Sequence, residues 1–154
     1  MTSYAAHCIL GIDPGNTHTA GAFIRDGIIV GKFYETNQRA LEILRGVSPD
    51  CRVVCEMIAS YGMAVGKTVF DTCVMIGRIQ AIFPDMERVT RIQVKTELCK
   101  SARAKDGNVR QALIDIYGPP GTKKAPGGTY GISGDQWAAL AVATAAANGC
   151  NLYQ

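Results

Sequence analysis

The stretch ILGIDPGNT, residues 9–17, ends an apolar run with the carboxylate of Asp13 and follows it at once with Pro14 and Gly15. A short apolar run bounded by turn residues is typical of a buried strand, so we expect a strand over Ala5–Asp13. Asp-Pro-Gly after a strand is also an ordinary turn. The position of Asp13 therefore indicates either such a turn or a functional carboxylate at the end of a strand.

The length and composition indicate one folded domain over residues 1–154. The chain has 154 residues, 47% of them hydrophobic and 19% charged, which is enough apolar surface for one core and too few residues for two. The sequence contains no apolar stretch of the length that spans a bilayer, and Met1–His7 does not resemble a secretion signal, so we expect a cytoplasmic protein. The six cysteines lie mostly in apolar runs and are expected to be reduced core residues.

The pattern along the rest of the chain predicts an α/β domain with a mixed sheet flanked by helices. An Asp-Gly turn at Arg25-Asp26-Gly27 is a strong hairpin signal between two strands. The expected strands after the first are Thr17–Arg25, Gly27–Tyr34, Arg52–Glu56 and Val89–Val94. The expected helices are Asn37–Arg45, Ala64–Phe83, Asn108–Tyr117 capped by Asp106, and an Ala-rich helix to about Asn148 that opens with a Ser133/Gln136 capping box.

The helix expected over Ala64–Phe83 has a wide apolar face. One face of a helix is enough to cover a sheet, which leaves Met75 and Ile79 as candidates for a contact with a second subunit. Burial of both side chains inside the monomer is the alternative.

Three carboxylates are candidate metal ligands. Asp13 and Glu56 each follow an expected buried strand, and Asp135 stands in the first turn of the last expected helix. Neighbouring carboxylates repel and raise one another's pKa, and a divalent cation such as Mg²⁺ or Mn²⁺ relieves that repulsion. A pair of such ions can activate a water molecule in phosphodiester cleavage. For Asp135 a favourable interaction with the helix dipole is the plainer explanation.

Basic residues are concentrated in one segment. Arg88–Arg110 contains seven basic residues against two acidic ones, whereas the whole chain carries a net charge of only +3. Such a segment suits a phosphate backbone, although a solvated helix face would have the same composition.

Four segments together resemble the RuvC-type Holliday junction resolvases of the RNase H-like superfamily, in particular the short versions found in phages and prophages. They are Gly11–Gly15 (GIDPG), Val54–Glu56 (VCE), Lys95–Val109 (KTELCKSARAKDGNV) and Gly134–Ala145 (GDQWAALAVATA), and they occur in the family's order. The resemblance implies the RNase H-like fold, a homodimer, and Mg²⁺-dependent nicking of four-way DNA junctions, with Mn²⁺ as a substitute. A phage-borne protein of this kind would act in the cytoplasm of a bacterial host.

The resemblance also assigns residues. Asp13, Glu56 and Asp135 match catalytic metal-binding acids, and Lys95 and Lys105 match two DNA-contacting lysines. We expect the neighbouring Lys100, Arg103 and Arg110 to line the same DNA channel, with Lys123 and Lys124 as additional contacts. Met57–Met63 matches a loop at the junction centre, where Tyr61 would stack on a base although Ala59 occupies the family's usual aromatic position.

The sequence departs from the family at Ala138, where a second acid usually stands one turn into the last helix. A three-carboxylate metal site, a helix displaced by about a turn, and a weak or inactive nuclease all agree with this departure. A protein that binds junctions without cutting them is therefore one alternative function. A second is an ATP-binding fragment of the actin-like or sugar-kinase type, whose first strand also ends in G-I-D-x-G but which needs two such domains to enclose the nucleotide.

Overall fold

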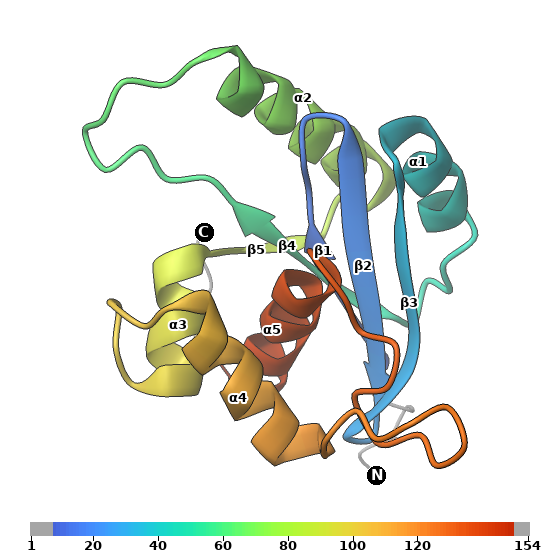
Figure 1. Cartoon of the computed structure of the whole chain (residues 1–154). Helices are drawn as coiled ribbons and strands as arrows, with labels where there is room; N and C mark the ends of the chain where they lie inside the picture. The colour runs from blue at the N-terminus through green and yellow to red at the C-terminus, as the bar shows by residue number, and fades with distance from the viewer. Residues whose placement is uncertain (1–7, 150–154) are drawn as a thin grey trace, which may run out of the picture.

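The computed structural model describes residues 8–149, which form a five-stranded mixed sheet between two layers of helices (Figure 1). Residues 5–7 of the first expected strand and Cys150 lie outside this range. The strands are β1 (Cys8–Asp13), β2 (His18–Arg25), β3 (Ile28–Thr36), β4 (Arg52–Met57) and β5 (Glu87–Thr90). The helices are α1 (Asn37–Arg45), α2 (Lys67–Ile82), α3 (Arg91–Cys99), α4 (Asp106–Tyr117) and α5 (Gln136–Ala147).

β1 lies at the centre of the sheet, whose strand order is β3-β2-β1-β4-β5. It pairs antiparallel with β2 and parallel with β4, and β4 pairs parallel with β5. Asp26 and Gly27 adopt positive φ angles of 51° and 77° between β2 and β3, as a tight hairpin turn requires, which confirms the predicted hairpin. The α/β class with a mixed sheet is likewise confirmed.

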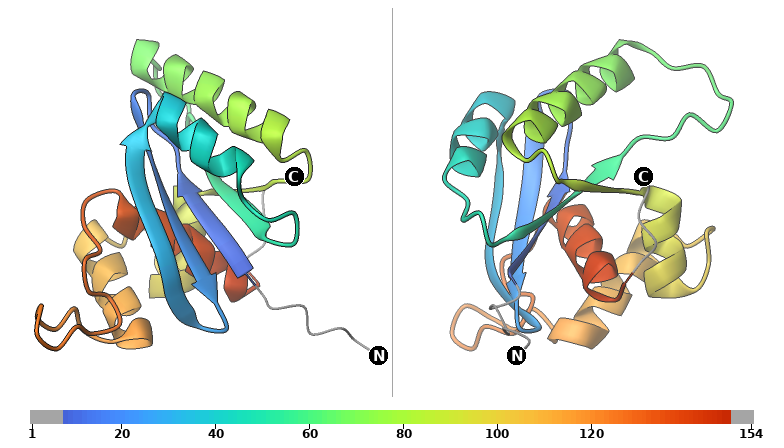
Figure 2. Two further views of the ribbon diagram at one scale, coloured as in Figure 1. Left: turned by 90° about the vertical axis from the view of Figure 1, so that its right-hand side faces the viewer. Right: turned by 180° about the vertical axis from the view of Figure 1, so that it is seen from behind.

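Each face of the sheet is covered by a different set of helices (Figure 2). On one face α1 and α2 pack over Leu10 and Ile12 of β1. On the other face α5 packs over Ile9 and Gly11, with α3 and α4 outside it. Because side chains alternate along a strand, Asp13 falls on the same face as Ile9 and Gly11, toward α5.

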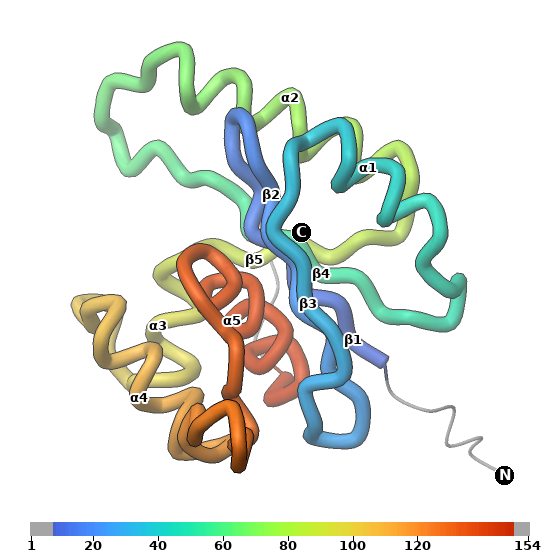
Figure 3. The backbone as a smooth tube through the Cα atoms, turned by 45° about the vertical axis from the view of Figure 1, so that its right-hand side comes forward, coloured from blue at the N-terminus to red at the C-terminus, as the bar shows by residue number. Residues whose placement is uncertain are grey.

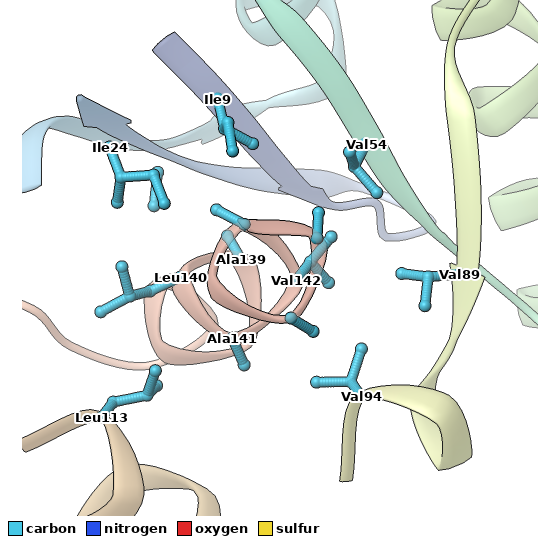
Figure 4. Close-up of a cluster of buried hydrophobic side chains, with 14 of the residues drawn as sticks. Ile9, Ile24, Val54, Val89, Val94, Leu113, Ala139, Leu140, Ala141 and Val142 are labelled. Carbon is cyan, nitrogen blue, oxygen red and sulfur yellow. The ribbon is translucent and has the colours of Figure 1, made fainter. Parts of the chain in front are cut away.

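The closest contact between layers is that of α5 with β1 at Gly11. A Cβ atom on Gly11 would fall inside van der Waals distance of the Ala139 carbonyl oxygen and the Ala143 amide nitrogen, both of the α5 backbone. Figure 4 shows Ala139 of α5 on the side that faces Ile9 of the sheet, while Ala141 lies on the opposite side of the helix, toward Leu113 and Val94. Glycine in the strand and alanine in the helix therefore allow the two backbones to approach.

The predicted strand over Val89–Val94 is wrong at its C-terminal half. The strand ends at Thr90, and α3 begins at Arg91. The Thr90 side chain accepts a hydrogen bond from the Gln93 amide, and the Gln93 side chain accepts one from the Thr90 amide. This capping box starts a helix that the apolar pattern alone did not indicate.

Other boundaries differ by a few residues. α2 starts at Lys67 and not at Ala64. Lys105 is the N-cap of α4, so Asp106 is its first helical residue and not its cap. In the last helix the N-cap is Asp135 and not Ser133. Of the two hydrogen bonds of the predicted capping box, the one present is that from the Ser133 amide to the Gln136 side chain, at 3.1 Å.

Met75 and Ile79 do not lie at a subunit surface. Both are buried in the core between α2 and the sheet, with exposed fractions of 2% and 0%. The predicted contact of these two residues with a second subunit is therefore wrong, because they belong to the face of α2 that covers the sheet. The exposed apolar residues of α2 are Phe70 and Val74.

Two further features concern the chain as a whole. No helix within residues 8–149 combines the length and the apolar character that crossing a membrane requires. The five cysteines in that range are free thiols that are buried or half-buried, as the sequence predicts.

We expect Gly11→Ala to destabilise the protein by about 1–3 kcal/mol or more, because the added methyl group forces α5 away from β1. Chemical unfolding in urea measures the change. Gly77→Ala is the matched control, since Gly77 lies in α2 with open space around the position of a Cβ, and there the substitution should stabilise by up to about 1 kcal/mol. Equal effects of the two substitutions would contradict the close approach.

Candidate active site

Asp13 and Glu56 lie side by side at the carboxyl ends of two parallel strands. The register pairs Ile12 of β1 with Cys55 of β4, so Asp13 and Glu56 are the next residues on the two strands. Adjacent strands are about 4.8 Å apart, and both side chains point toward α5. A side-chain hydrogen bond between the two raises the pKa of Asp13 and lowers that of Glu56, which is the pattern expected when Asp13 carries the shared proton. The two carboxyl groups thus form one hydrogen-bonded pair.

The protein environment makes this pair hard to ionise fully. Burial raises the pKa of Asp13 to about 8, and the negative charges of Glu56 and Asp135 add to the effect. Burial also raises the pKa of Glu56, while the nearby Arg91 guanidinium opposes that rise. Without a further cation, the pair therefore retains a proton at neutral pH.

The carboxyl pair opens into a cavity of about 130 Å³ between the sheet and the helices α3, α4 and α5. Figure 3 shows these three helices side by side on this face of the sheet. Five residues predicted as site residues from the sequence line the cavity together: Asp13, Glu56, Lys95, Arg110 and Asp135. Ala138, where the resemblance to the RuvC-type resolvases led us to expect a second acid, also lines it. Residues far apart in the sequence thus meet in one cavity that contains both acids and bases.

Three charged or aromatic cavity residues were not predicted as site residues from the sequence: Arg91, Asp106 and Trp137. Arg91 donates to Asp106 at 2.8 Å, and the Arg110 guanidinium lies 5.2 Å from the centre of the Trp137 ring. Arg91 fell within the basic segment, but the prediction of a strand through Val94 concealed its place at the start of α3. The capping box of Thr90 and Gln93 was the signal that would have shown it.

The remaining candidate DNA contacts lie outside the cavity. Lys100 ends α3 with a left-handed backbone, Arg103 is exposed in the connection to α4, and Lys105 is exposed at the start of α4. Lys123 and Lys124 are exposed in the loop that precedes α5. Tyr61 is 60% exposed in the long loop between β4 and α2, which extends away from the sheet in Figure 1.

The donor set of the cavity suits a divalent cation. Asp13 and Glu56 offer carboxylate oxygens, the ligands that Mg²⁺ and Mn²⁺ prefer, and because burial raises the pKa of both, a nearby cation would favour their ionised forms. Within residues 8–149, no three His, Cys, Asp or Glu side chains already stand where they would hold an ion together. Asp135 shares the cavity with the pair but does not complete a group of three with it. The residues therefore fit a metal held by two carboxylates, with water and substrate oxygens as its other ligands.

Comparison with solved structures identifies the fold. The chain is similar to the structure of RuvC from Thermus thermophilus, with 19% identity, a TM-score of 0.69, and coverage of 95% of this chain and 99% of that one. It is also similar to T. thermophilus RuvC in complex with a Holliday junction substrate, with 18% identity, a TM-score of 0.71, and coverage of 96% and 99%. No protein-family model and no curated protein sequence matches the chain. The chain has the RNase H-like fold of RuvC over nearly its whole length.

We expect the metal-free protein to lose stability as the pH rises from about 4 to about 8. The pKa of Asp13 is raised in the folded state, so folding binds a proton that the unfolded chain has already released in this range. The contribution of Asp13 is therefore complete below pH 4 and is lost as the pH approaches 8. Asp13→Asn removes the titration, and the difference in melting temperature between this variant and the original protein should grow over this interval.

Melting curves recorded in a metal chelator at several pH values measure this difference. Mg²⁺ or Mn²⁺ should then raise the melting temperature of the original protein at pH 8 more than that of Asp13→Asn. A constant difference between the two proteins from pH 5 to pH 8 would show that Asp13 is not held in a proton-retaining pair.

Proposed function

We propose that the protein is a structure-selective endodeoxyribonuclease that resolves four-way DNA junctions by metal-dependent hydrolysis of phosphodiester bonds. The observation that carries this proposal is the half-buried Asp13–Glu56 pair inside a cavity that also contains Arg91, Lys95 and Arg110. Carboxylates that need a cation, next to bases that suit a phosphate, are the combination that phosphodiester cleavage requires. The similarity to RuvC supports the four-way junction as the substrate.

The reaction is the hydrolysis of one P–O bond in a DNA strand. The oxygen of a water molecule forms a new bond to phosphorus, the bond from phosphorus to the leaving sugar oxygen breaks, the water releases a proton, and the leaving oxygen takes one up. A divalent ion held by Asp13 and Glu56 would supply charge stabilisation and a more acidic water. Asp135, which also lines the cavity, would orient that water.

The residues of this chain supply the remaining functions. Lys95 is the least exposed of the cavity's ion-paired bases, with 19% of its side chain accessible, and lies 3.9 Å from Asp106. It would hold the phosphate of the cleaved strand. Lys100, Arg103 and Lys105 follow on the adjacent surface and would track the backbone beyond that phosphate. Tyr61 would stack on a base at the junction centre.

A two-fold dimer would give each of two symmetric strands its own active site. The outer face of α2 offers a surface for such a dimer, because Phe70 and Val74 are 59% and 62% exposed on neighbouring turns. Met63 and Val65, in the loop that leads into α2, are also exposed. These residues replace Met75 and Ile79, which are buried, as the side chains expected to meet a second copy of the chain.

A protein that binds junctions without cutting them is the second candidate function. Ala138 favours it, because the cavity lacks a carboxylate at the place where the family usually has one. The two candidates share the basic residues and differ only in whether the carboxyl pair acts on the bound phosphate.

The decisive experiment incubates the protein with a labelled four-way junction, a replication fork and a linear duplex, with and without Mg²⁺. We expect paired nicks in the junction only when Mg²⁺ is present. Asp13→Asn should reduce the cleavage rate by orders of magnitude while junction affinity persists or increases, because the repulsion between carboxylate and phosphate is relieved.

Asp85→Asn is the matched control, since Asp85 is an exposed carboxylate that does not line the cavity, and it should cut like the original protein. Junction binding without cleavage would favour the second candidate function. Equal cutting of all three substrates would contradict junction selectivity.

We expect the protein to be a dimer at micromolar concentration and Phe70→Glu to shift it toward the monomer, because a buried charge at an apolar contact is costly. Sedimentation equilibrium measures the mass. Ile116→Glu is the control, since Ile116 is 52% exposed on α4, outside the proposed surface. A chain that is monomeric both alone and on junction DNA would contradict the dimer.

A further inference from the structure

The Arg91 guanidinium is placed at the carboxyl pair by the fold itself. Arg91 is the first residue of α3 and lines the cavity that contains Asp13 and Glu56. Its charge opposes the rise that burial causes in the pKa of both carboxyl groups, and its hydrogen bond with Asp106, followed by the charges of Glu56 and Asp13, raises the pKa of Arg91. Arg91 therefore already supplies positive charge to the centre at which a metal ion would bind.

A second carboxylate holds Arg91 in this position. Asp106, the first residue of α4, accepts a hydrogen bond from Arg91 at 2.8 Å, and Arg91 lowers the pKa of Asp106. Arg91 is the first residue of α3 and Asp106 is the first residue of α4, and both line the cavity. The ion pair uses one terminal nitrogen of the guanidinium, and because a guanidinium has five N–H donors, others remain for a ligand.

The α5 side of the cavity is poor in metal ligands. Its lining residues are Gly134, Asp135, Trp137, Ala138, Ala141 and Val142. In this described segment Asp135 is the single carboxylate, and the next turn presents the methyl group of Ala138. Since Asp106 is engaged by Arg91, the carboxylates left for metal are Asp13, Glu56 and Asp135, and two ions about 4 Å apart would share only these three.

We propose that Arg91 is the second positive centre of this active site: the site takes one divalent ion at Asp13 and Glu56, and Arg91 donates hydrogen bonds to a non-bridging oxygen of the scissile phosphate. The inference rests on the proposed nuclease function and deepens it. Arginine clamps stabilise the charge of a transferring phosphoryl group as metal ions do, without a change of protonation. Asp106 is then a positioning residue that acts through Arg91.

The number of bound ions is the first test, because it does not depend on catalysis. Isothermal titration with Mn²⁺ should give one ion per chain for the original protein. Arg91→Gln should still bind one ion and bind it several-fold more tightly, because a positive charge next to the ion is removed. Two ions per chain in the original protein, or loss of Mn²⁺ binding in Arg91→Gln, would overturn the proposal.

The second test separates catalysis from binding on junction DNA. Arg91→Gln should lower kcat by about 100-fold, the usual effect of removing one donor to the transition state, and change KM by only a few-fold. Arg91→Lys should recover part of kcat, since it retains the charge but not the planar pair of donors. A normal kcat in Arg91→Gln would overturn the proposal.

Variants of Asp106 test its role in positioning Arg91, and a second arginine–carboxylate pair serves as the control. Asp106→Asn should lower kcat less than Arg91→Gln does, and Asp106→Glu should restore it. Arg39→Gln is the control, because Arg39 pairs with Glu42 at the same 2.8 Å on α1, away from the cavity, and its loss should leave kcat unchanged. Melting curves confirm that each variant is folded.

The double variant Arg91→Gln/Ala138→Asp gives the positive test. It restores an acid to α5 and removes the competing charge, so it should bind two Mn²⁺ ions and cut faster than Arg91→Gln alone. A double variant with one ion and no recovery would count against the proposal. If the original protein binds one ion and a junction but cuts no DNA, the proposed nuclease function is wrong. Tighter Mn²⁺ binding by Arg91→Gln would still support the position of Arg91 next to the metal ion.

Discussion

The contact between the backbones of β1 and α5 at Gly11 is the constraint on which the site depends. A strand and a helix approach this closely only where the side chains between them are absent or no larger than a methyl group, and Gly11, Ala139 and Ala143 meet that condition. The contact fixes α5 along the central strand two residues before Asp13. It therefore sets where Asp135 and Ala138 stand relative to Asp13. The position of Asp135 relative to Asp13 is thus a consequence of core packing and not of local chain geometry.

The parallel pairing of β1 with β4 is the second part of the same arrangement. It brings Asp13 and Glu56 together on the α5 face, where burial raises the pKa of both. Such a pair destabilises the metal-free fold at neutral pH, so the protein carries an electrostatic cost at the place where a cation would act. The starts of α3 and α4 lie around the same cavity and bring Arg91, Lys95 and Arg110 to it. Asp13 and Glu56 come from strand ends, whereas Arg91, Lys95 and Arg110 come from the first halves of two helices.

The sequence predicted most of the sheet and the acids because both have local signals. The apolar runs ending at Asp13 and Glu56, and the Asp26-Gly27 turn, can be recognised without any knowledge of tertiary contacts. The errors arose where the tertiary context decides. The amphipathic pattern of α2 was recognised, but which of its faces meets the sheet depends on packing, so Met75 and Ile79 were assigned to the wrong surface. The Arg91–Asp106 pair joins residues of two helices, and no spacing in the sequence indicates it.

Ala138 affects both the volume and the charge of the cavity. The methyl group of Ala138 lines the cavity, and this small side chain leaves space beside the carboxyl pair. Space without a carboxylate lowers the negative charge of the site and makes a second metal ion harder to hold. The Arg91 guanidinium and a bound metal ion repel each other because both are positive. An arginine beside Asp13 and Glu56 therefore suits a site that holds few metal ions. Ala138 and Arg91 are therefore physically consistent with each other. Ala138 offers no metal ligand, and its small side chain leaves space in which the Arg91 guanidinium can approach the phosphate.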